Sequence, residues 1–275
     1  SEIDADLAAD HRMLRLLQGD VGSGKTIVAL MAMLSAVEAG GQAVIMAPTE
    51  ILSRQHMVTI SQMAEAAGIQ PVLLTGRERG KKRDAILEKL KIGAARLAVG
   101  THALFQDDVE YHDLRVAVID EQHRFGVHQR LTLAAKGRAV DVLVMTATPI
   151  PRTLMLTAYG DMDVSRLTEK PAGRKPIQTV LISNDRLDEV VHAVGRAVKS
   201  NARVYWVCPI IEESETSDMA AAELRYDHLK AAFGKRVGLV HGRLKGAEKD
   251  AVMSAFKDGE IDILVATTVI EVGVD

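Results

Sequence analysis

The chain has 275 residues, of which 47% are hydrophobic and 26% charged, with a formal net charge of -3 and a pI of about 6.3. This composition excludes a disordered or fibrous chain, and no apolar run approaches the roughly 18 residues that a membrane span requires. The length favours two domains, because single cores tend to split near this size. The single cysteine, Cys208, excludes an internal disulfide and suits a core position in a reducing compartment.

Charge and termini add two expectations. The balance of charge gives no global signal for nucleic acid, although local basic clusters can bind phosphates on an acidic protein. The first segment, "SEIDADLAADHRM", is acidic and unlike a secretory signal. The last, "DILVATTVIEVGVD", stops within a pattern, so we expect a piece of a longer protein.

The first motif along the chain is "GDVGSGKT", which follows a short apolar segment and precedes a helical pattern. Its spacing is that of a phosphate-binding loop, in which glycines let backbone N–H groups face phosphate oxygens. Lys25 would neutralise the β- and γ-phosphates, and the Thr26 hydroxyl would ligate Mg²⁺ at the helix N-terminus. ATP and Mg²⁺ are therefore the expected cofactors, held by Gly19, Asp20, Val21, Gly22, Ser23, Gly24, Lys25 and Thr26.

After this loop, β-branched apolar runs alternate with segments of helical periodicity. This alternation is typical of a parallel sheet built from strand–helix–strand units. The expected helices are Thr26–Ala39 and Ile51–Ala67, each closed by glycine. The expected strands are residues 42–48, 71–76, 96–102, 116–121 and 140–148.

Two carboxylates, Asp120 and Glu121, end one of these strands, at the edge where open parallel sheets place their ligands. We expect Asp120 to hold Mg²⁺ and Glu121 to orient or deprotonate an attacking water. The segment "TATPIPRT", Thr146–Thr153, follows the next buried strand and places hydroxyls beside the expected nucleotide. A small-molecule kinase has no need of such a segment, so the pattern favours a motor.

The alternation stops at Thr168–Gln178, where prolines, a glycine and mixed charges predict a linker. Beyond it we expect strands at 179–183, 203–209, 237–242 and 262–267, with helices near 185–199, 219–233 and 245–258. The fold expected is two α/β domains in tandem, 1–170 and 171–275, the second incomplete at its C-terminus. A second domain without its own phosphate loop suits a cleft whose closure moves one domain against the other.

The ordered series "GDVGSGKT", "APTEIL", "GTHALFQ", "DEQHRFG", "TATPIPRT", "VHGRL" and "ATTVIEVGVD" resembles the motifs of superfamily 2 helicases. More narrowly, "DEQHRFGV", "YGDMDVSRL", "GRKPI" and "CPIIEESE" resemble the motor of the RecG family of bacterial DNA helicases. The resemblance implies two tandem RecA-like parallel-sheet domains. It further implies ATP-dependent remodelling of stalled replication forks and branch migration of Holliday junctions.

The same resemblance implies residue roles. Lys25, Asp120 and Glu121 would serve catalysis, with Gln122 and His123 linking the nucleotide to the DNA-facing side. Thr146 and Thr148 would couple hydrolysis to movement. Contacts with the DNA backbone or at the interdomain cleft are implied for Thr49, Thr101, His102, Thr267, Thr268 and Glu271. Specificity would be for forked or branched DNA structure and not for sequence.

Two groups of residues carry weaker signals. His241 is expected to be satisfied locally and not to be catalytic. A basic cluster formed by Arg77, Arg79, Lys81, Lys82 and Arg83 fits DNA phosphates about as well as a solvated helix face.

Two alternative functions stay open. One is the duplex translocase of a transcription-repair coupling factor, where we expect a glutamate in place of Gln122. The other is a non-hydrolytic nucleotide-binding regulatory module, against which the intact Lys25, Asp120 and Glu121 count. The chain ends before the segment in which this superfamily carries its arginine fingers, so we expect it to hydrolyse ATP weakly or not at all. We expect a bacterial cytoplasmic monomer with single-strand binding protein as a candidate partner.

Overall fold

The computed structural model describes residues 1–120, 140–148, 162–169, 177–208 and 215–267, the last range without the side chains of 215–220. The chain divides into two compact units, Ser1–Lys175 and Pro176–Asp275. Among the helices of the described residues, none is long and apolar enough to cross a membrane.

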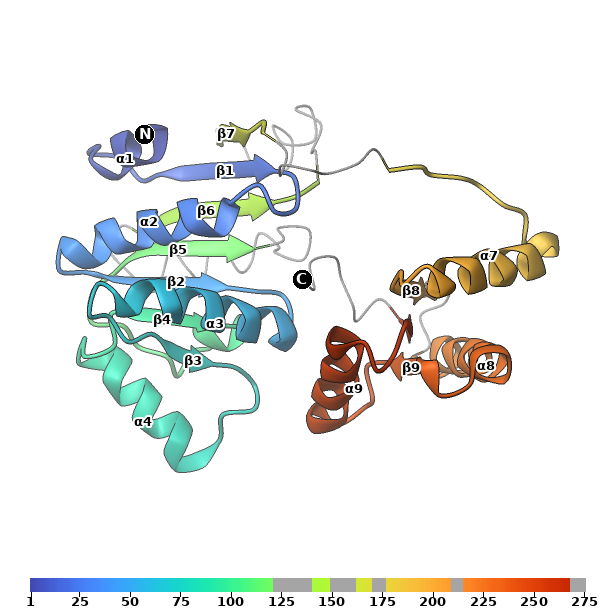
Figure 1. Ribbon diagram of the computed structural model, residues 1–275. Coiled ribbons are helices and arrows are strands. Elements are labelled where there is room, and N and C mark those ends of the chain that lie inside the picture. The colour runs from blue at the N-terminus through green and yellow to red at the C-terminus, as the bar shows by residue number, and fades with distance from the viewer. Residues whose placement is uncertain (121–139, 149–161, 170–176, 209–214, 268–275) are drawn as a thin grey trace. The chain divides into compact units, whose positions relative to one another are not determined.

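Unit 1 is built on a parallel sheet of seven strands in the order β3-β4-β2-β5-β6-β1-β7 (Figure 1). Because the strands are parallel, their carboxyl ends meet at one edge of the sheet. The strands are β1 (Leu14–Gly19), β2 (Gln42–Met46), β3 (Val72–Leu74), β4 (Leu97–Gly100), β5 (Leu114–Asp120), β6 (Asp141–Thr146) and β7 (Asp163–Leu167).

Helices cover both faces of this sheet, so its strands are apolar on both sides. In β2, Ala43 and Ile45 pack with α1 (Glu2–Leu7), α2 (Lys25–Glu38) and α3 (Glu50–Glu65), whereas Val44 and Met46 face the opposite core. That second core receives α4 (Gly80–Lys91) and the 3₁₀ helix η1 (His102–Phe105). All five residues of β2 are consequently buried.

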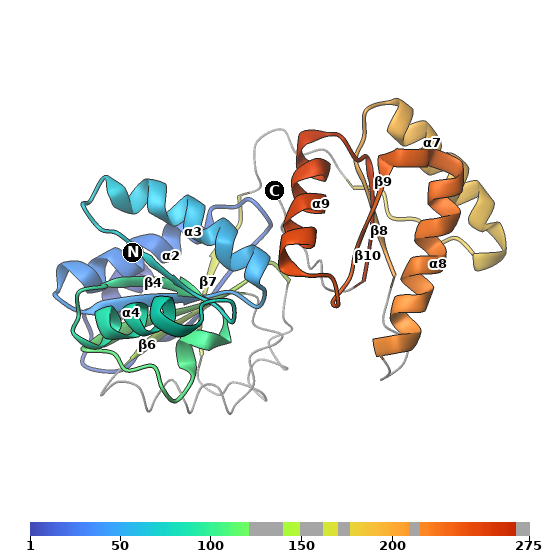
Figure 2. The same cartoon turned by 90° about the horizontal axis from the view of Figure 1, so that it is seen from below.

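Unit 2 has a parallel sheet of three strands in the order β8-β10-β9, formed by β8 (Val204–Val207), β9 (Val237–Val240) and β10 (Ile263–Ala266). One face packs against α7 (Leu187–Lys199) and α8 (Glu215–Phe233), and the other against α9 (Gly246–Asp258), as Figure 2 shows. Short 3₁₀ turns, η3 (Asn184–Arg186) and η4 (Gly234–Arg236), precede α7 and β9. Cys208 lies in this core, as expected, and burial raises the pKa of its thiol.

The elements expected from the sequence are confirmed with one exception. The run 179–183 was expected to be a strand, and this prediction is wrong. Val180 and Leu181 are 72% and 99% exposed, and the run has no strand partner among the described residues. Strand propensity alone does not form a strand, because pairing and burial supply its stability. Three elements were not among those predicted with bounds: α1, α4 and β7, although a helix face was one interpretation of the basic residues at the start of α4.

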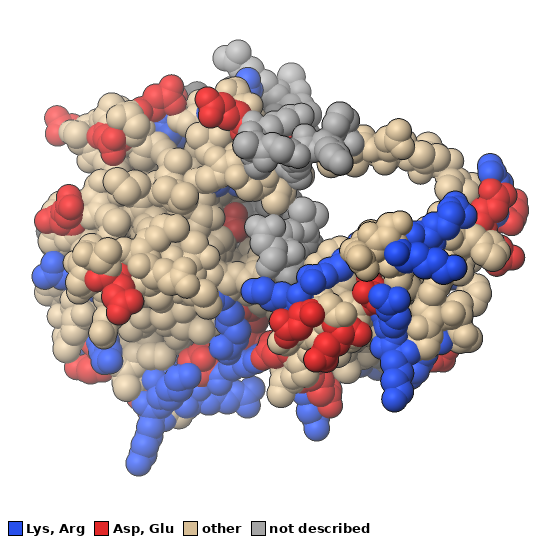
Figure 3. All heavy atoms as spheres, in the orientation of Figure 1, with Lys and Arg blue, Asp and Glu red and all other residues tan. Residues whose placement is uncertain are grey.

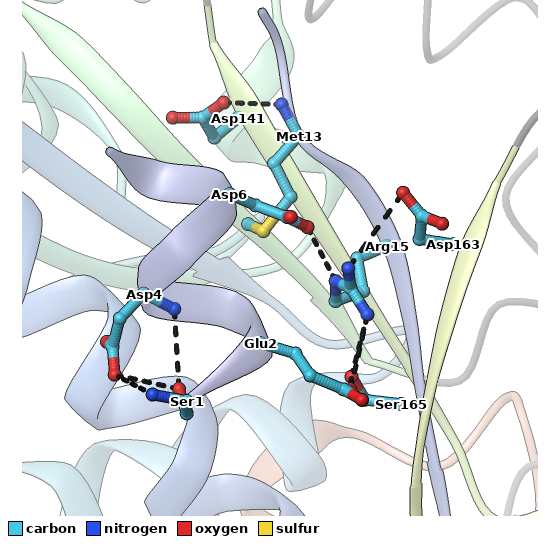
Figure 4. Close-up of polar contacts among 9 residues, drawn as sticks. All are labelled: Ser1, Glu2, Asp4, Asp6, Met13, Arg15, Asp141, Asp163 and Ser165. Carbon is cyan, nitrogen blue, oxygen red and sulfur yellow. Dashed lines mark hydrogen bonds and ion pairs between the residues drawn. The ribbon is translucent and has the colours of Figure 1, made fainter. Parts of the chain in front are cut away.

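A buried arginine attaches α1 to the edge of the sheet (Figure 4). Arg15 on β1 is 8% exposed and donates from Nε to the Asp6 carboxylate at 2.6 Å and from Nη1 to the Ser165 hydroxyl at 3.0 Å. The Glu2 carboxylate lies 3.4 Å from Arg15 Nη1 and also accepts from the Ser165 hydroxyl. One guanidinium therefore joins α1, β1 and β7.

A second polar contact sets the start of β1 against β6. The Met13 amide donates to Asp141 Oδ1 at 2.7 Å, as Figure 4 also shows. Burial raises the pKa of the Asp141 carboxyl above its ordinary value, although the Met13 hydrogen bond opposes the shift. The contact supports the register in which Leu14 lies opposite Val142.

We expect Arg15→Met to lower the free energy of unfolding by about 3 kcal/mol, because the change leaves the Asp6 carboxylate desolvated without its partner. Chemical denaturation followed by circular dichroism would measure the loss. The control is Lys91→Met, which breaks the exposed Lys91–Glu110 pair and should leave stability unchanged. Equal stability of the Arg15 variant and the parent chain would contradict the role given to Arg15.

Candidate nucleotide-binding site

The loop Gly19–Thr26 joins the end of β1 to the start of α2. Gly22 and Gly24 have φ of 77° and 91°, in the left-handed region that favours glycine. Gly19 is required for a different reason, because a Cβ there would lie 2.5 Å from Ser23 Oγ and 3.0 Å from Leu167 Cβ. These three glycines therefore shape the backbone of the loop that is predicted to bind phosphate.

Lys25, the first residue of α2, folds back over the loop. Its Nζ donates to the carbonyl oxygens of Gly19 at 2.8 Å and Asp20 at 3.0 Å. The Asp20 side chain closes the turn by accepting from the Val21 amide at 2.8 Å. The ammonium group is thus held at the mouth of the loop, where phosphate oxygens would replace carbonyl oxygens as its acceptors.

The loop has features suited to binding a nucleoside triphosphate and its metal ion. Ser23 Oγ is buried and has no hydrogen-bond partner among the described residues, so it has an unsatisfied hydrogen-bonding group to offer a phosphate. Hydroxyl and carboxylate oxygens, here from Thr26 and Asp120, are the donors that Mg²⁺ prefers. Mg²⁺ bound with a nucleotide usually takes only one or two ligands from the protein and the rest from phosphate oxygens and water.

Asp120 ends β5 and faces a histidine that the motif analysis did not single out. Its Oδ2 lies 2.7 Å from Nε2 of His56 on α3, and the two side chains are 13% and 11% exposed. The signal that could have identified His56 is its position. It is a polar residue four residues after Leu52 and four before Ile60, both buried.

The expected coupling threonines lie at the end of β6, between β1 and β5. The Oγ1 atoms of Thr146 and Thr148 are 3.0 Å apart, and the Thr148 amide donates to Thr146 Oγ1 at 3.2 Å. Gln18, directly before the phosphate loop, donates from Nε2 to the Thr148 carbonyl at 3.2 Å. This hydrogen bond, which sequence reasoning missed, ties the threonine segment to the nucleotide loop.

The residues expected to contact DNA in unit 1 follow β2 and β4, on the other half of the same sheet edge. Thr49 caps α3 by accepting from the Leu52 amide, and Thr101 caps η1 by accepting from the Ala103 amide. Each hydroxyl retains its hydrogen for a phosphate oxygen, although Thr101 is only 5% exposed. His102 is exposed.

The basic cluster lies on the turn before α4 and on its first residues, where Figure 3 shows Lys and Arg side chains gathered. The turn is fixed by a buried carboxylate, since Glu78 accepts from both the amide and the hydroxyl of Thr75 at 2.7 Å. Burial raises the pKa of Glu78, but these hydrogen bonds and Lys82 outweigh it and leave the pKa below its ordinary value. Arg77 pairs with Glu50 at 2.7 Å, which joins the turn to the first residue of α3.

In unit 2, Thr267 follows β10 and is 6% exposed. His241 is also buried, but its Nδ1 has no hydrogen-bond partner in the described part of the chain, so the expected local contact is not seen at that atom. Five other expected site residues lie outside the described residues: Glu121, Gln122, His123, Thr268 and Glu271.

We expect Gly19→Ala to weaken nucleotide binding roughly tenfold or more, equivalent to about 1.4 kcal/mol. The added Cβ must displace Ser23 and with it the loop backbone. Titration of a fluorescent ADP analogue would measure the affinity. Gly76→Ala is the matched control, because open space surrounds that position. An unchanged affinity in the Gly19 variant would contradict the steric argument.

Known proteins match this chain over its whole length. Residues 5–157 match the DEAD/DEAH box helicase family, and 183–275 match the helicase conserved C-terminal domain. The chain is 52% identical over 280 residues to the ATP-dependent DNA helicase RecG of Pasteurella multocida (strain Pm70) and 50% identical over 281 residues to that of Escherichia coli (strain K12). Each alignment covers 100% of this chain and 40% of the relative, so the chain spans about 40% of their length.

Solved structures agree with this assignment. A structure of RecG bound to a three-way DNA junction matches with a TM-score of 0.74 and 42% identity, over 100% of this chain and 36% of that one. Mss116p bound to single-stranded RNA and AMP-PNP also has a TM-score of 0.74, over 97% of this chain and 59% of that one. At 19% identity it supports the fold alone. The chain belongs to the DEAD/DEAH box helicase family, and its two units are tandem RecA-like domains.

Proposed function

We propose that the chain is the motor portion of an ATP-dependent DNA helicase of the RecG type. The protein would remodel stalled replication forks and branch-migrate Holliday junctions, with residues 1–170 as the ATP-binding domain and 171–275 as the second motor domain. The observation that carries the proposal is the sheet edge of unit 1. There the phosphate loop, Asp120 and the Thr146–Thr148 pair follow three strands that are neighbours in the sheet.

The residues of this edge have separate tasks in ATP hydrolysis. Backbone N–H groups of the loop and Lys25 would bind the phosphates, while Thr26 and Asp120 would hold Mg²⁺. The chemistry supplied by Mg²⁺ is neutralisation of charge on the β- and γ-phosphate oxygens. We assign to Glu121 the acceptance of a proton from the attacking water. The water oxygen bonds to the γ-phosphorus as the bond from that phosphorus to the bridging oxygen breaks, and ADP leaves. Gln122 and His123 would connect this step to the DNA-facing side.

Movement would follow from the contacts at β6. Gln18 links the loop to the Thr148 carbonyl, and the two threonine hydroxyls contact each other. A change in the conformation of the phosphate loop would therefore reach the segment after β6 through the hydrogen bond from Gln18 to the Thr148 carbonyl. We propose that Thr146 and Thr148 transmit it, with Thr267, Thr268 and Glu271 responding in the second domain.

The DNA backbone would lie along the ends of β2 and β4. Thr49, Thr101 and His102 supply hydrogen-bond donors there, and the basic turn adds positive charge next to α3. Such contacts carry no base information, so recognition would rest on DNA structure. The RecG relative solved with a three-way junction supports a branched substrate.

Two other functions are less well supported. The chain is 50–52% identical to proteins named RecG, and this favours a fork-remodelling motor over a coupling-factor translocase. A non-hydrolytic module is disfavoured because the sequence retains Lys25, Asp120 and Glu121, and a site freed from catalysis has no physical need of both metal-binding and water-activating carboxylates. We further propose a monomer in the bacterial cytoplasm, with single-strand binding protein as a candidate partner.

We expect forked DNA to stimulate ATP turnover by this chain more than linear duplex or single-stranded DNA, although absolute rates are expected to be low. Steady-state phosphate release measures the three stimulations, with Lys25→Ala as the blank. Equal stimulation by forks and linear duplex would favour the coupling-factor translocase. Glu121→Gln separates hydrolysis from binding, since it should retain ATP and lose turnover. Turnover that no DNA stimulates and that Glu121→Gln leaves unchanged would favour the non-hydrolytic module.

We expect the double substitution Arg79→Ala/Lys81→Ala to weaken DNA binding uniformly across sequences. If both exposed side chains contact phosphates, the slope of log K against log salt should fall in magnitude by about 2. Fluorescence anisotropy at several salt concentrations gives that slope. Lys89→Ala/Lys91→Ala removes two exposed charges from the other end of α4 and should leave the slope unchanged. Equal slopes for the parent chain and the Arg79/Lys81 variant would show that these two side chains are solvated and do not contact DNA phosphates.

A further inference from the structure

Asp120 is held by a helix from another part of the chain. His56 Nε2 and Asp120 Oδ2 are 2.7 Å apart, although 64 residues separate them in the sequence. Because an ionised carboxylate only accepts hydrogen bonds, Nε2 is the donor. With side chains 11% and 13% exposed, the pair is largely shielded from competing water. A hydrogen bond shielded in this way is electrostatically stronger than the same bond in water.

The helix that carries His56 is itself fixed. Its first turn is capped by Thr49, whose hydroxyl accepts from the Leu52 amide and whose carbonyl accepts from the Ser53 hydroxyl at 2.9 Å. One turn after His56, Ile60 is fully buried in the core against the sheet. The imidazole therefore projects from a packed helix face at a defined position. The His56 imidazole can therefore hold the Asp120 carboxylate at one value of the Asp120 χ2 angle.

From this geometry we infer that His56 is a positioning residue for Asp120, fixing the carboxylate in the orientation that Mg²⁺–nucleotide binding requires. The inference rests on the proposed function, which makes Asp120 a metal ligand. Carboxylates that bind metals are themselves held by hydrogen bonds, and losing such a partner typically costs about 10- to 100-fold in metal affinity or activity. His56 does not touch the nucleotide in this scheme, so its effect passes through Asp120 alone.

The test compares binding of a fluorescent ADP analogue in Mg²⁺ and in EDTA. In the parent chain Mg²⁺ should strengthen binding. His56→Phe keeps a ring of similar size without the N–H donor, so it should reduce that Mg²⁺-dependent gain about 10- to 100-fold and leave binding in EDTA unchanged. His56→Gln restores an N–H donor and should recover most of the gain.

The matched control is Ile60→Val, which loosens the same helix face without touching Asp120. It should lower thermal stability modestly and leave the Mg²⁺-dependent gain intact. A His56→Phe variant with the parent's Mg²⁺ dependence would overturn the inference, as would a loss of Mg²⁺ dependence in Ile60→Val equal to that in His56→Phe. If His56→Phe does not fold, His56→Ala takes its place. It also lacks the N–H donor and should lose the same Mg²⁺-dependent gain, which His56→Gln should keep, and a His56→Ala variant with the parent's Mg²⁺ dependence would overturn the inference.

Failure of the proposed function gives a different result. A parent chain that binds no nucleotide in either condition would refute the function, and the inference with it. If the parent chain binds nucleotide normally and the variants at residue 56 keep its Mg²⁺ dependence, only the role of His56 is refuted.

Discussion

Parallel pairing of β5, β6 and β1 is the constraint on which the candidate site depends. In this register Gln18 lies opposite Thr146, and Asp120 lies opposite Met145, so the three strands end together. Residues more than 120 positions apart in the sequence thereby meet at one edge. Because the strands are buried on both faces, the edge is held by the full core of the unit and not by the loops themselves.

Polar contacts around this edge connect elements that the sheet alone would leave independent. Gln18 joins the phosphate loop to the threonine segment, His56 joins α3 to Asp120, and the Arg77–Glu50 pair joins the basic turn to α3. Helix α3 thus carries Thr49 at its N-cap and His56 two turns later, so one packed helix positions two of the residues to which we assign roles.

Unit 2 shows why a run of strand-forming residues becomes a strand only where a neighbouring strand pairs with it. The runs 204–207, 237–240 and 263–266 became strands, because each pairs with a neighbour and buries apolar side chains. The run 179–183 is equally β-branched and apolar, yet it is not a strand, and Leu181 is almost fully exposed. Composition did not distinguish this run from the others, because pairing depends on parts of the chain distant in sequence.

The sequence by itself determined the α/β class, the tandem arrangement, the phosphate loop and the carboxylate at the end of β5. These features depend on local spacing: apolar periodicity, glycines at positions of positive φ, and polar residues directly after buried strands. Only the tertiary structure decided the strand order, the buried Arg15 cluster, the Gln18–Thr148 bond and the His56–Asp120 pair. Each of these joins residues distant along the chain, and no spacing within a single segment can specify such a contact.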